Sequence, residues 1–130
     1  MKLYLLRHAI AVERGTPGFE DDSLRPLTEA GRDKMQRIAR GMKTLGLSFD
    51  HILTSAYVRA EQTATIVAAA LGSEKRLMTE PLLAADQEPH AILTNLAGAE
   101  GESSNVLLVG HEPYLSELAS LLIGSVQNGA

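Results

Sequence analysis

Leu3-Tyr4-Leu5-Leu6-Arg7-His8-Ala9 is the stretch that decides the fold, because an apolar run of strand length ends directly in an arginine and a histidine. A second apolar run, Val106-Leu107-Leu108-Val109-Gly110, is followed by His111 in the same way. Continuous apolar runs are typical of strands that are buried on both faces of a parallel sheet. Since α/β folds build their sites at the carboxyl edge of such a sheet, we expect His8 and His111 to meet there.

The rest of the chain alternates between strand-like and helix-like segments. Further strands are predicted at 51–55 and, more briefly, within 77–83, and helices at about 28–45, 57–71, 89–96 and 113–123. Thr28 is a typical helix N-cap, and Gly46 and Gly72 follow the ends of two predicted helices. Between the first strand and the first helix, residues 13–26 form a loop of a length that usually has a function or is mobile. The pattern predicts a three-layer α/β/α sandwich with a mostly parallel central sheet.

Length and composition restrict the class of protein. At 130 residues and 45% hydrophobic residues, we expect one domain over 1–130. No apolar stretch approaches the roughly 20 residues that span a bilayer, so a soluble protein without membrane partners is expected. The chain has no cysteine, which excludes thiolate chemistry and is compatible with a cytoplasmic location. The net charge of −4 argues against nucleic acid as a partner, so an anionic substrate needs a local arginine cluster.

The Arg7-His8 pair places a nucleophilic imidazole beside a permanent cation, which indicates phosphoryl chemistry. A neutral imidazole nitrogen can attack phosphorus and form a phosphoenzyme, which divides one difficult transfer into two easier ones. The other ring nitrogen then needs a hydrogen-bond acceptor that keeps the attacking nitrogen unprotonated. The alternative for a lone histidine is a structural role at the end of a strand.

Four separated blocks of sequence resemble the histidine phosphatase superfamily and, within it, the small SixA-type phosphohistidine phosphatases. The blocks are Leu5-Leu6-Arg7-His8-Ala9, Leu24-Arg25-Pro26-Leu27-Thr28, Thr54-Ser55-Ala56-Tyr57-Val58-Arg59-Ala60-Glu61-Gln62-Thr63-Ala64 and Val109-Gly110-His111-Glu112-Pro113. The resemblance covers essentially the whole chain. It implies a phosphoglycerate mutase-like fold and a phosphatase that hydrolyses phosphohistidine on a partner protein through a phosphohistidine intermediate on His8. The implied partner is a phosphorylated protein such as a histidine-containing phosphotransfer domain.

Two other functions remain open. The first is a small-molecule phosphomonoesterase or mutase of the same superfamily, which would use the same nucleophile. The second is an inactive module that has kept the arginine pocket and only binds phosphate. No cofactor or metal is implied, because the histidines are too scattered for a local zinc motif and arginine charges replace the charge of a metal.

Arg7, Arg59 and His111 are expected to form the pocket for the transferring phosphoryl group together with the nucleophile His8. The equatorial oxygens of the phosphoryl group carry negative charge, and fixed cationic donors stabilise this charge as bonds form and break. The planar fork of arginine binds two oxygens at once. Arg59 also lies near the start of a predicted helix, where backbone amides favour an anion.

Arg25 and Ser55 are further candidates for phosphate binding. Arg25 matches a phosphate-contacting arginine of the resembling family, and its alternative role is a surface ion pair with Asp21 or Asp22. Ser55 would either donate a hydrogen bond to the phosphate or cap the helix that follows it.

Several acidic residues are candidates for the general acid. Glu112 is one candidate, because some branches of the superfamily place an acid there, and its alternative role is to favour the start of the following helix. The other candidates are the loop acids Glu13, Glu20, Asp21 and Asp22. A phosphoramidate such as phosphohistidine cleaves with less help than an ester, so a weak or absent acid fits that substrate.

Two features depart from the family pattern. Ala9 stands where the superfamily usually has glycine, and its methyl group restricts how closely the backbone approaches the phosphate. We expect activity to survive this change. The chain also ends at Gly129-Ala130, where relatives of this type continue for one or two more strands. The domain is therefore expected to lack C-terminal strands or to close its sheet differently.

Overall fold

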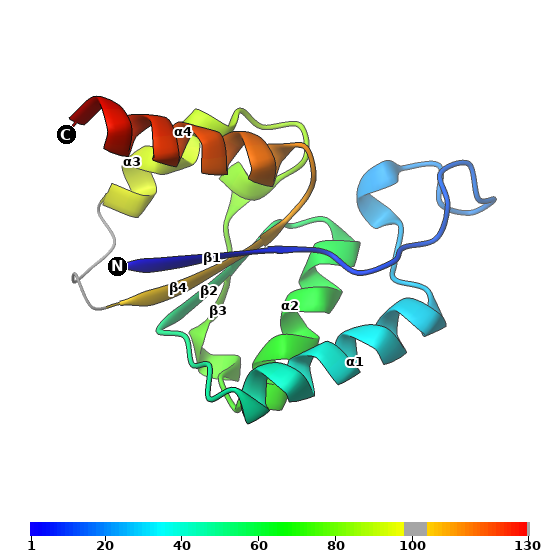
Figure 1. Cartoon of the computed structure of the whole chain (residues 1–130). Helices are drawn as coiled ribbons and strands as arrows, with labels where there is room; N and C mark the ends of the chain where they lie inside the picture. The colour runs from blue at the N-terminus through cyan, green and yellow to red at the C-terminus, as the bar shows by residue number, and fades with distance from the viewer. Residues whose placement is uncertain (98–103, 130) are drawn as a thin grey trace.

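A four-stranded parallel sheet forms the centre of the computed structural model, which describes residues 1–97 and 104–129. The strands are β1 (Lys2–Arg7), β2 (His51–Thr54), β3 (Leu77–Thr79) and β4 (Asn105–Gly110), in the spatial order β1-β4-β2-β3. Every pairing in this sheet is parallel. β1 and β4 therefore lie side by side and end at the same edge, which places the residues after them next to each other (Figure 1).

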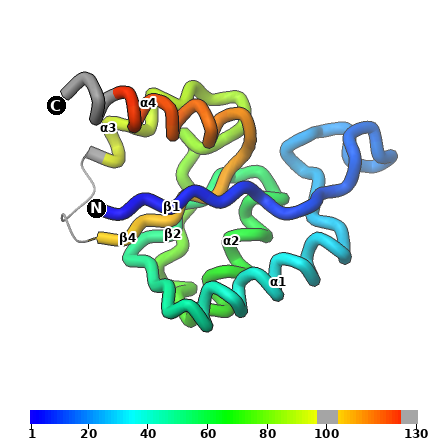
Figure 2. Tube along the Cα trace, viewed as in Figure 1, coloured from blue at the N-terminus to red at the C-terminus, as the bar shows by residue number. Residues whose placement is uncertain are grey.

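Helices cover both faces of the sheet and complete the predicted α/β/α sandwich. α1 (Glu29–Thr44) and α2 (Val58–Leu71) lie on one face, and α3 (Ile92–Ala97) and α4 (Tyr114–Gly129) lie on the other (Figures 1 and 2). Short 3₁₀ turns connect these elements at Asp22–Leu24, Glu74–Arg76, Pro81–Leu83 and Pro89–Ala91. In the part of the chain that is described, no helix combines the length and apolarity needed to cross a bilayer.

The side chains of β4 alternate between two apolar cores. Leu107 and Val109 pack into the core under α1 and α2, whereas Val106 and Leu108 pack into the core under α3 and α4. All four side chains are at most 1% exposed. This burial on both faces explains why the strand reads as a continuous apolar run rather than an alternating one.

α1 begins and ends where the sequence predicts. The Thr28 side chain accepts a hydrogen bond from the amide of Gly31 at 2.9 Å, which confirms the N-cap. Gly46 follows the helix with a φ of 75°, a left-handed conformation that favours glycine. Gly31 lies against the segment after His8, because a Cβ added to it would stand 2.3 Å from the Ile10 carbonyl oxygen. The start of α1 is therefore packed directly against the backbone that leaves the sheet edge.

Several boundaries differ from the sequence prediction. β3 covers only 77–79, because the 3₁₀ turn Pro81–Leu83 follows it. Residues 89–96 form a 3₁₀ turn and then a short α-helix rather than one continuous helix. α4 begins at Tyr114, one residue after the predicted start. The loop over 13–26 leaves the sheet and returns through a bridge between Ala11 and Leu27, with the turn Asp22–Leu24 inside it.

Candidate active site

His8 and His111 follow the neighbouring strands β1 and β4 and meet at the carboxyl edge of the sheet. The backbone amide of His8 donates to the carbonyl of Gly110, the residue before His111, at 3.0 Å. The centroids of the two imidazole rings are 5.2 Å apart. The parallel register therefore brings together two side chains that are 103 positions apart in the chain (His8 to His111).

The hydrogen bonds of His8 define which ring nitrogen can attack. Nδ1 lies 2.7 Å from the carbonyl oxygen of Ala9, which can only accept, so Nδ1 carries the ring hydrogen. Nε2 therefore carries the lone pair, which accepts a hydrogen bond from Nε of Arg59 at 3.2 Å. Burial lowers the pKa of His8 below its ordinary value, and the positive charges of Arg59 and Arg7 lower it further. The hydrogen bond to the Ala9 carbonyl raises the pKa but does not outweigh these effects. The imidazole is neutral at neutral pH, with Nε2 available as a nucleophile.

Ala9 fits its position without strain. Its amide donates to the hydroxyl of Thr63 at 3.0 Å, which ties the end of β1 to α2. Among the described residues, positive φ angles occur only at glycines, so the backbone at Ala9 is one that alanine adopts freely. Sequence reasoning did not identify the acceptor for His8, because the acceptor is a backbone carbonyl that any residue at position 9 would supply.

Arg59 lies in the first turn of α2 and is 3% exposed. In addition to its bond to His8, it donates from Nη1 to the backbone carbonyl of Asp22 at 2.7 Å and from Nη2 to the Asp22 carboxylate at 3.1 Å. Its guanidinium carbon also lies 5.0 Å from the centroid of the Tyr57 ring, within the range of a cation–π contact. All three guanidinium nitrogens are therefore held in fixed directions beside the nucleophile.

Arg25 belongs to the same cluster from the loop side and is 8% exposed. Its Nε donates to the Asp22 carboxylate at 2.7 Å, its Nη2 lies 2.6 Å from the same oxygen, and its Nη1 donates to the carbonyl of Val12 at 2.6 Å. The pairing with Asp22 that the sequence left as an alternative does occur. Arg25 also lines the same hollow as His8.

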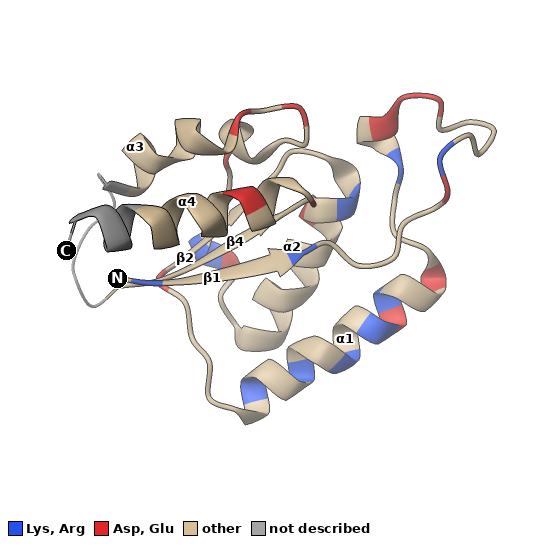
Figure 3. Cartoon of the chain, turned by 45° about the horizontal axis from the view of Figure 1, so that its top comes forward, with Lys and Arg blue, Asp and Glu red and all other residues tan. Residues whose placement is uncertain are grey.

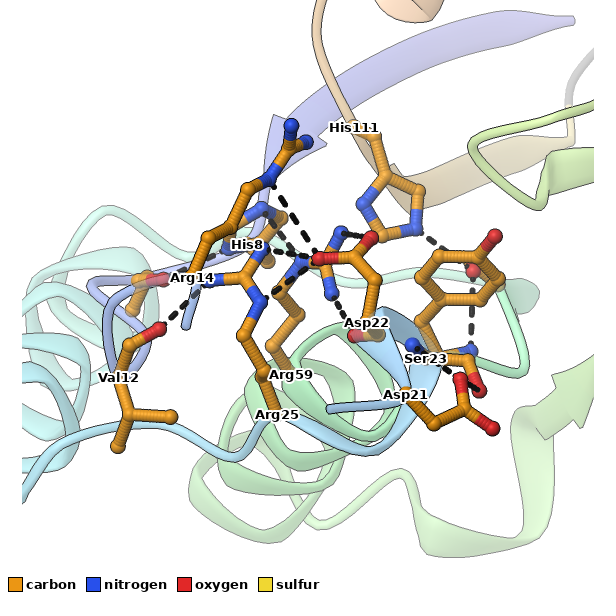
Figure 4. A network of polar contacts seen from close by, with 12 residues as sticks. His8, Val12, Arg14, Asp21, Asp22, Ser23, Arg25, Arg59 and His111 are labelled. Carbon is orange, nitrogen blue, oxygen red and sulfur yellow. Dashed lines mark hydrogen bonds and ion pairs between the residues drawn. The ribbon is translucent and has the colours of Figure 1, made fainter. Parts of the chain in front are cut away.

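Asp22 is the residue that sequence reasoning placed least well. It was one of four loop acids, but its carboxylate bridges two buried guanidiniums, with Arg14 3.6 Å away as a third, exposed cation (Figure 4). Burial raises the pKa of Asp22, but hydrogen bonds from Arg25 and Arg59 outweigh burial and hold the pKa below its ordinary value. Acidic and basic residues follow one another along this loop (Figure 3), and that pattern alone does not say which carboxylate faces the site.

His111 is buried, and its hydrogen bonds bear on its tautomer as well. Nε2 lies 2.8 Å from the hydroxyl of Ser55, and the amide of Tyr57 already donates to that hydroxyl. The hydroxyl hydrogen of Ser55 can be donated to Nε2, and in that arrangement the ring hydrogen lies on Nδ1. Nδ1 has no partner among the described residues and lies on the side of the ring that faces Arg59 and Asp22 (Figure 4). An unsatisfied buried donor is costly, and a ligand oxygen would satisfy it.

Burial and charge keep this second imidazole neutral. Burial lowers the pKa of His111 to about 4, with the charges of Arg59 and His8 acting in the same direction. The ring of Tyr57 packs against His111 edge-on at 4.9 Å between centroids. His111 is therefore fixed on one side by Tyr57 and on another by Ser55, and it presents a neutral N–H group.

Arg7 lies at the exposed end of β1 and makes no hydrogen bond or ion pair within residues 1–97 and 104–129. It lines a hollow of about 470 Å³ together with His8 and Arg25. The structure therefore brings Arg7 to the site without fixing its guanidinium.

Glu112 lies beyond this cluster and contacts the start of α4. Its carboxylate accepts hydrogen bonds from the amide of Ser116, at 3.0 Å, and from the Ser116 hydroxyl. This is the helix-start role that the sequence left as the alternative for Glu112. Within the part of the chain that the structure covers, no group of three histidine, aspartate or glutamate side chains is arranged to hold a metal ion.

Comparison with known proteins identifies the family to which the chain is similar. The family model of the histidine phosphatase superfamily (branch 1) matches residues 3–85. The phosphohistidine phosphatase SixA of Escherichia coli is 27% identical over 123 residues, which are 94% of this chain and 74% of that protein. A SixA structure complexed with tungstate superposes with a TM-score of 0.81 at 26% identity, over 92% of this chain and 75% of that one.

A putative SixA from Agrobacterium tumefaciens superposes with a TM-score of 0.78 at 31% identity, over 93% of this chain and 75% of that chain. The chain belongs to the histidine phosphatase superfamily.

Proposed function

We propose that this protein is a phosphohistidine phosphatase that acts on a phosphorylated partner protein and passes the phosphoryl group through His8. The observation that carries the proposal is the pairing of an unprotonated His8 Nε2 with the buried guanidinium of Arg59, 3.2 Å away. The unpartnered Nδ1 of His111 supports it, because this donor faces the same cluster. The SixA relative that was solved with tungstate, a tetrahedral oxyanion, supports a pocket of this kind.

In the first step, the phosphoryl group of the substrate binds between the guanidiniums of Arg7, Arg25 and Arg59 and the Nδ1 hydrogen of His111. The lone pair of His8 Nε2 attacks phosphorus, and the bond from phosphorus to the imidazole of the partner histidine breaks. The leaving imidazole takes a proton from solvent water, and the phosphoryl group remains on His8. Positive charge that is fixed in advance stabilises the phosphoryl oxygens as charge shifts among them.

In the second step, water attacks the phosphorus of phosphorylated His8. The P–N bond breaks, inorganic phosphate leaves, and Nε2 regains its lone pair. The Ala9 carbonyl keeps the ring hydrogen on Nδ1 through both steps, so the same nitrogen is regenerated for the next cycle. Ser55 acts here as a positioning residue, because its hydroxyl holds the tautomer of His111.

The environment of the acidic residues favours a phosphoramidate over a phosphate ester as substrate. Glu112 is engaged by Ser116 at the start of α4, and the pKa of Asp22 is held below its ordinary value by two arginines. Glu112 is therefore held away from the cluster by its contacts with Ser116, and the lowered pKa of Asp22 keeps that carboxyl ionised at neutral pH. An imidazole leaving group accepts a proton readily, so a substrate that bears one needs less help than an ester.

We also propose that the reaction needs no metal or cofactor, because guanidinium groups supply the positive charge at the phosphoryl site. The cysteine-free composition supports a cytoplasmic location. A histidine-containing phosphotransfer domain is the proposed kind of partner, since it presents a phosphorylated imidazole on its surface.

The test compares two classes of substrate under the same conditions. A ³²P-labelled histidine-containing phosphotransfer domain and a panel of sugar phosphates are incubated with the protein in the presence of EDTA. The proposal predicts rapid release of phosphate from the labelled domain, slow release from the sugar phosphates and no effect of EDTA. Faster turnover of a sugar phosphate would instead indicate a small-molecule phosphatase, and phosphate binding without release from any substrate would indicate an inactive module.

A further inference from the structure

The two buried guanidiniums of the site already hold an anion that belongs to the chain itself. Arg25 directs two of its nitrogens at the Asp22 carboxylate, and Arg59 directs one nitrogen at the carboxylate and another at the Asp22 carbonyl. The remaining nitrogens contact the carbonyl of Val12 and Nε2 of His8. Every nitrogen of both guanidiniums is therefore used inside the protein.

A phosphoryl group that reaches His8 needs the same donors. The Arg59 nitrogen closest to the nucleophile donates to His8, and its other two nitrogens donate to Asp22. Each Nη carries a second hydrogen, but the hydrogens nearest Asp22 are directed at it, so a phosphoryl group that takes those same hydrogen bonds must displace Asp22. The carboxylate is a planar oxyanion and the phosphoryl group is a tetrahedral one, and both match the fork of arginine. They therefore compete for one set of hydrogen bonds.

The position of Asp22 in the chain allows such an exchange. The residue is the first of the short turn Asp22–Leu24, inside the loop over 13–26 that extends from the sheet edge (Figure 1). Its side chain is 39% exposed, whereas those of Arg25 and Arg59 are 10% and 3% exposed. The carboxylate can therefore move toward solvent, while the two guanidiniums remain in place.

We propose that Asp22 is an internal competitor of the phosphoryl group: its carboxylate occupies the guanidiniums of Arg25 and Arg59 in the free protein, and binding of the phosphoryl group displaces it. This inference rests on the proposed function, because it concerns the anion that the site accepts. Every ligand that binds must first break the same contacts between Asp22 and the two arginines. Weak anions therefore bind poorly, and the site stays closed to them until a ligand with further contacts arrives.

The test measures the binding of inorganic phosphate by calorimetry to the wild type, to Asp22→Asn and to Asp21→Asn. Asp21→Asn is the matched control, because it removes the same charge one residue away, where the carboxylate contacts only Ser23. Loss of the competing charged hydrogen bonds predicts binding that is about tenfold tighter or more in Asp22→Asn. The control should bind like the wild type. Thermal unfolding of each variant establishes that it is folded.

Hydrogen exchange adds a measurement that a purely structural role of Asp22 would not change. In the wild type, saturating phosphate should speed exchange of the amides in the turn Asp22–Leu24, because the turn loses its contacts to Arg59. Phosphate affinity in folded Asp22→Asn that is equal to or weaker than that of the wild type would overturn the inference and leave the proposed function standing. Absence of phosphate binding in all three proteins would overturn both.

Discussion

His8 carries its ring hydrogen on Nδ1, and the proposed function needs His111 to carry its hydrogen on Nδ1 as well, but the two nitrogens face different surroundings. His8 gives its hydrogen to the Ala9 carbonyl, which leaves Nε2 free to attack. His111 accepts the Ser55 hydroxyl at Nε2, which leaves its Nδ1 hydrogen free for a ligand. One contact in each case therefore determines whether the imidazole acts as a nucleophile or as a donor.

Ser55→Ala tests the contact that fixes His111. The substitution removes the hydroxyl hydrogen and leaves Nε2 of a buried ring without a partner, so the hydrogen can move to Nε2 and leave the site without its donor. We expect kcat/KM for a phosphohistidine substrate to fall about tenfold or more. Ser55→Thr, which keeps the hydroxyl, should recover most of the activity. Equal kcat/KM in Ser55→Ala and the wild type would show that His111 does not donate to the phosphoryl group.

Arg59→Lys tests whether the planar fork matters or only the charge. Lysine has one nitrogen where arginine has three, so it cannot donate to His8 and to Asp22 at the same time. The expected loss in kcat is about 10²-fold or more, as for removal of a fixed donor to a developing charge. Arg37→Lys on the exposed side of α1 is the matched control and should keep full activity. Similar steady-state rates for both variants would contradict the assigned role of Arg59.

At the scale of the elements, the start of α1 is the part that most directly supports the site. Gly31 lies where a Cβ would stand 2.3 Å from the Ile10 carbonyl oxygen, on the segment that follows His8. Thr28 donates its amide to the same carbonyl at 2.9 Å. The helix and the segment after His8 are therefore held together through one backbone oxygen.

A pair of glycine substitutions on this helix should have opposite effects on stability. Gly31→Ala forces the backbone of residue 10 away from α1 and is expected to lower the free energy of unfolding by about 2 kcal/mol or more. Gly41→Ala meets nothing within 4 Å. It should raise the free energy of unfolding by about 0.5–1 kcal/mol through better helix propensity. Urea titrations of both variants check the prediction, and destabilisation by Gly41→Ala or tolerance of Gly31→Ala would contradict the packing described for α1.

The sequence predicted the elements that are buried or capped locally. β1 and β4 are evident as apolar runs because helices pack on both faces of the sheet, and α1 is evident from Thr28 and from the spacing of its buried residues. The segment over 89–96 was predicted less well, because its division into a 3₁₀ turn and a short helix depends on contacts with α4 rather than on a local signal.

At the scale of the whole molecule, the two neutral histidines should make stability depend on pH. Burial lowers the pKa of His111 to about 4 and lowers the pKa of His8, so the unfolded chain binds more protons than the folded one between roughly pH 6.5 and pH 4. The free energy of unfolding therefore has its full value above pH 6.5 and decreases as the pH falls through this window. Urea midpoints at pH 7.0, 5.5 and 4.5 check this.

Two variants separate this effect from general acid unfolding. His111→Asn should reduce the slope of stability against pH in the window, because the buried ring that resists protonation is gone. His90→Asn, which removes an exposed histidine, should leave the slope as it is in the wild type. An unchanged slope in His111→Asn would mean that protonation of this ring is not resisted in the folded state.

The candidate site could be predicted as a set of residues but not as a network. His8 and His111 were expected to meet because each follows a strand of a parallel sheet, whereas Arg59 was predicted through the resemblance to the histidine phosphatase superfamily. The bridge from Asp22 to Arg59 crosses 37 positions, and the contact from Ser55 to His111 crosses 56. Such contacts depend on how a loop folds over the sheet edge, and no local spacing encodes them.

The central claim is that His8 carries the phosphoryl group. Its most direct test is to react the protein with a ³²P-labelled phosphohistidine protein, quench within milliseconds and map the label. The account predicts a phosphoenzyme that is labile in acid and stable in alkali, with the label on His8 and none in His8→Asn. Label on another residue of a protein that turns over, or undiminished turnover by His8→Asn, would contradict it.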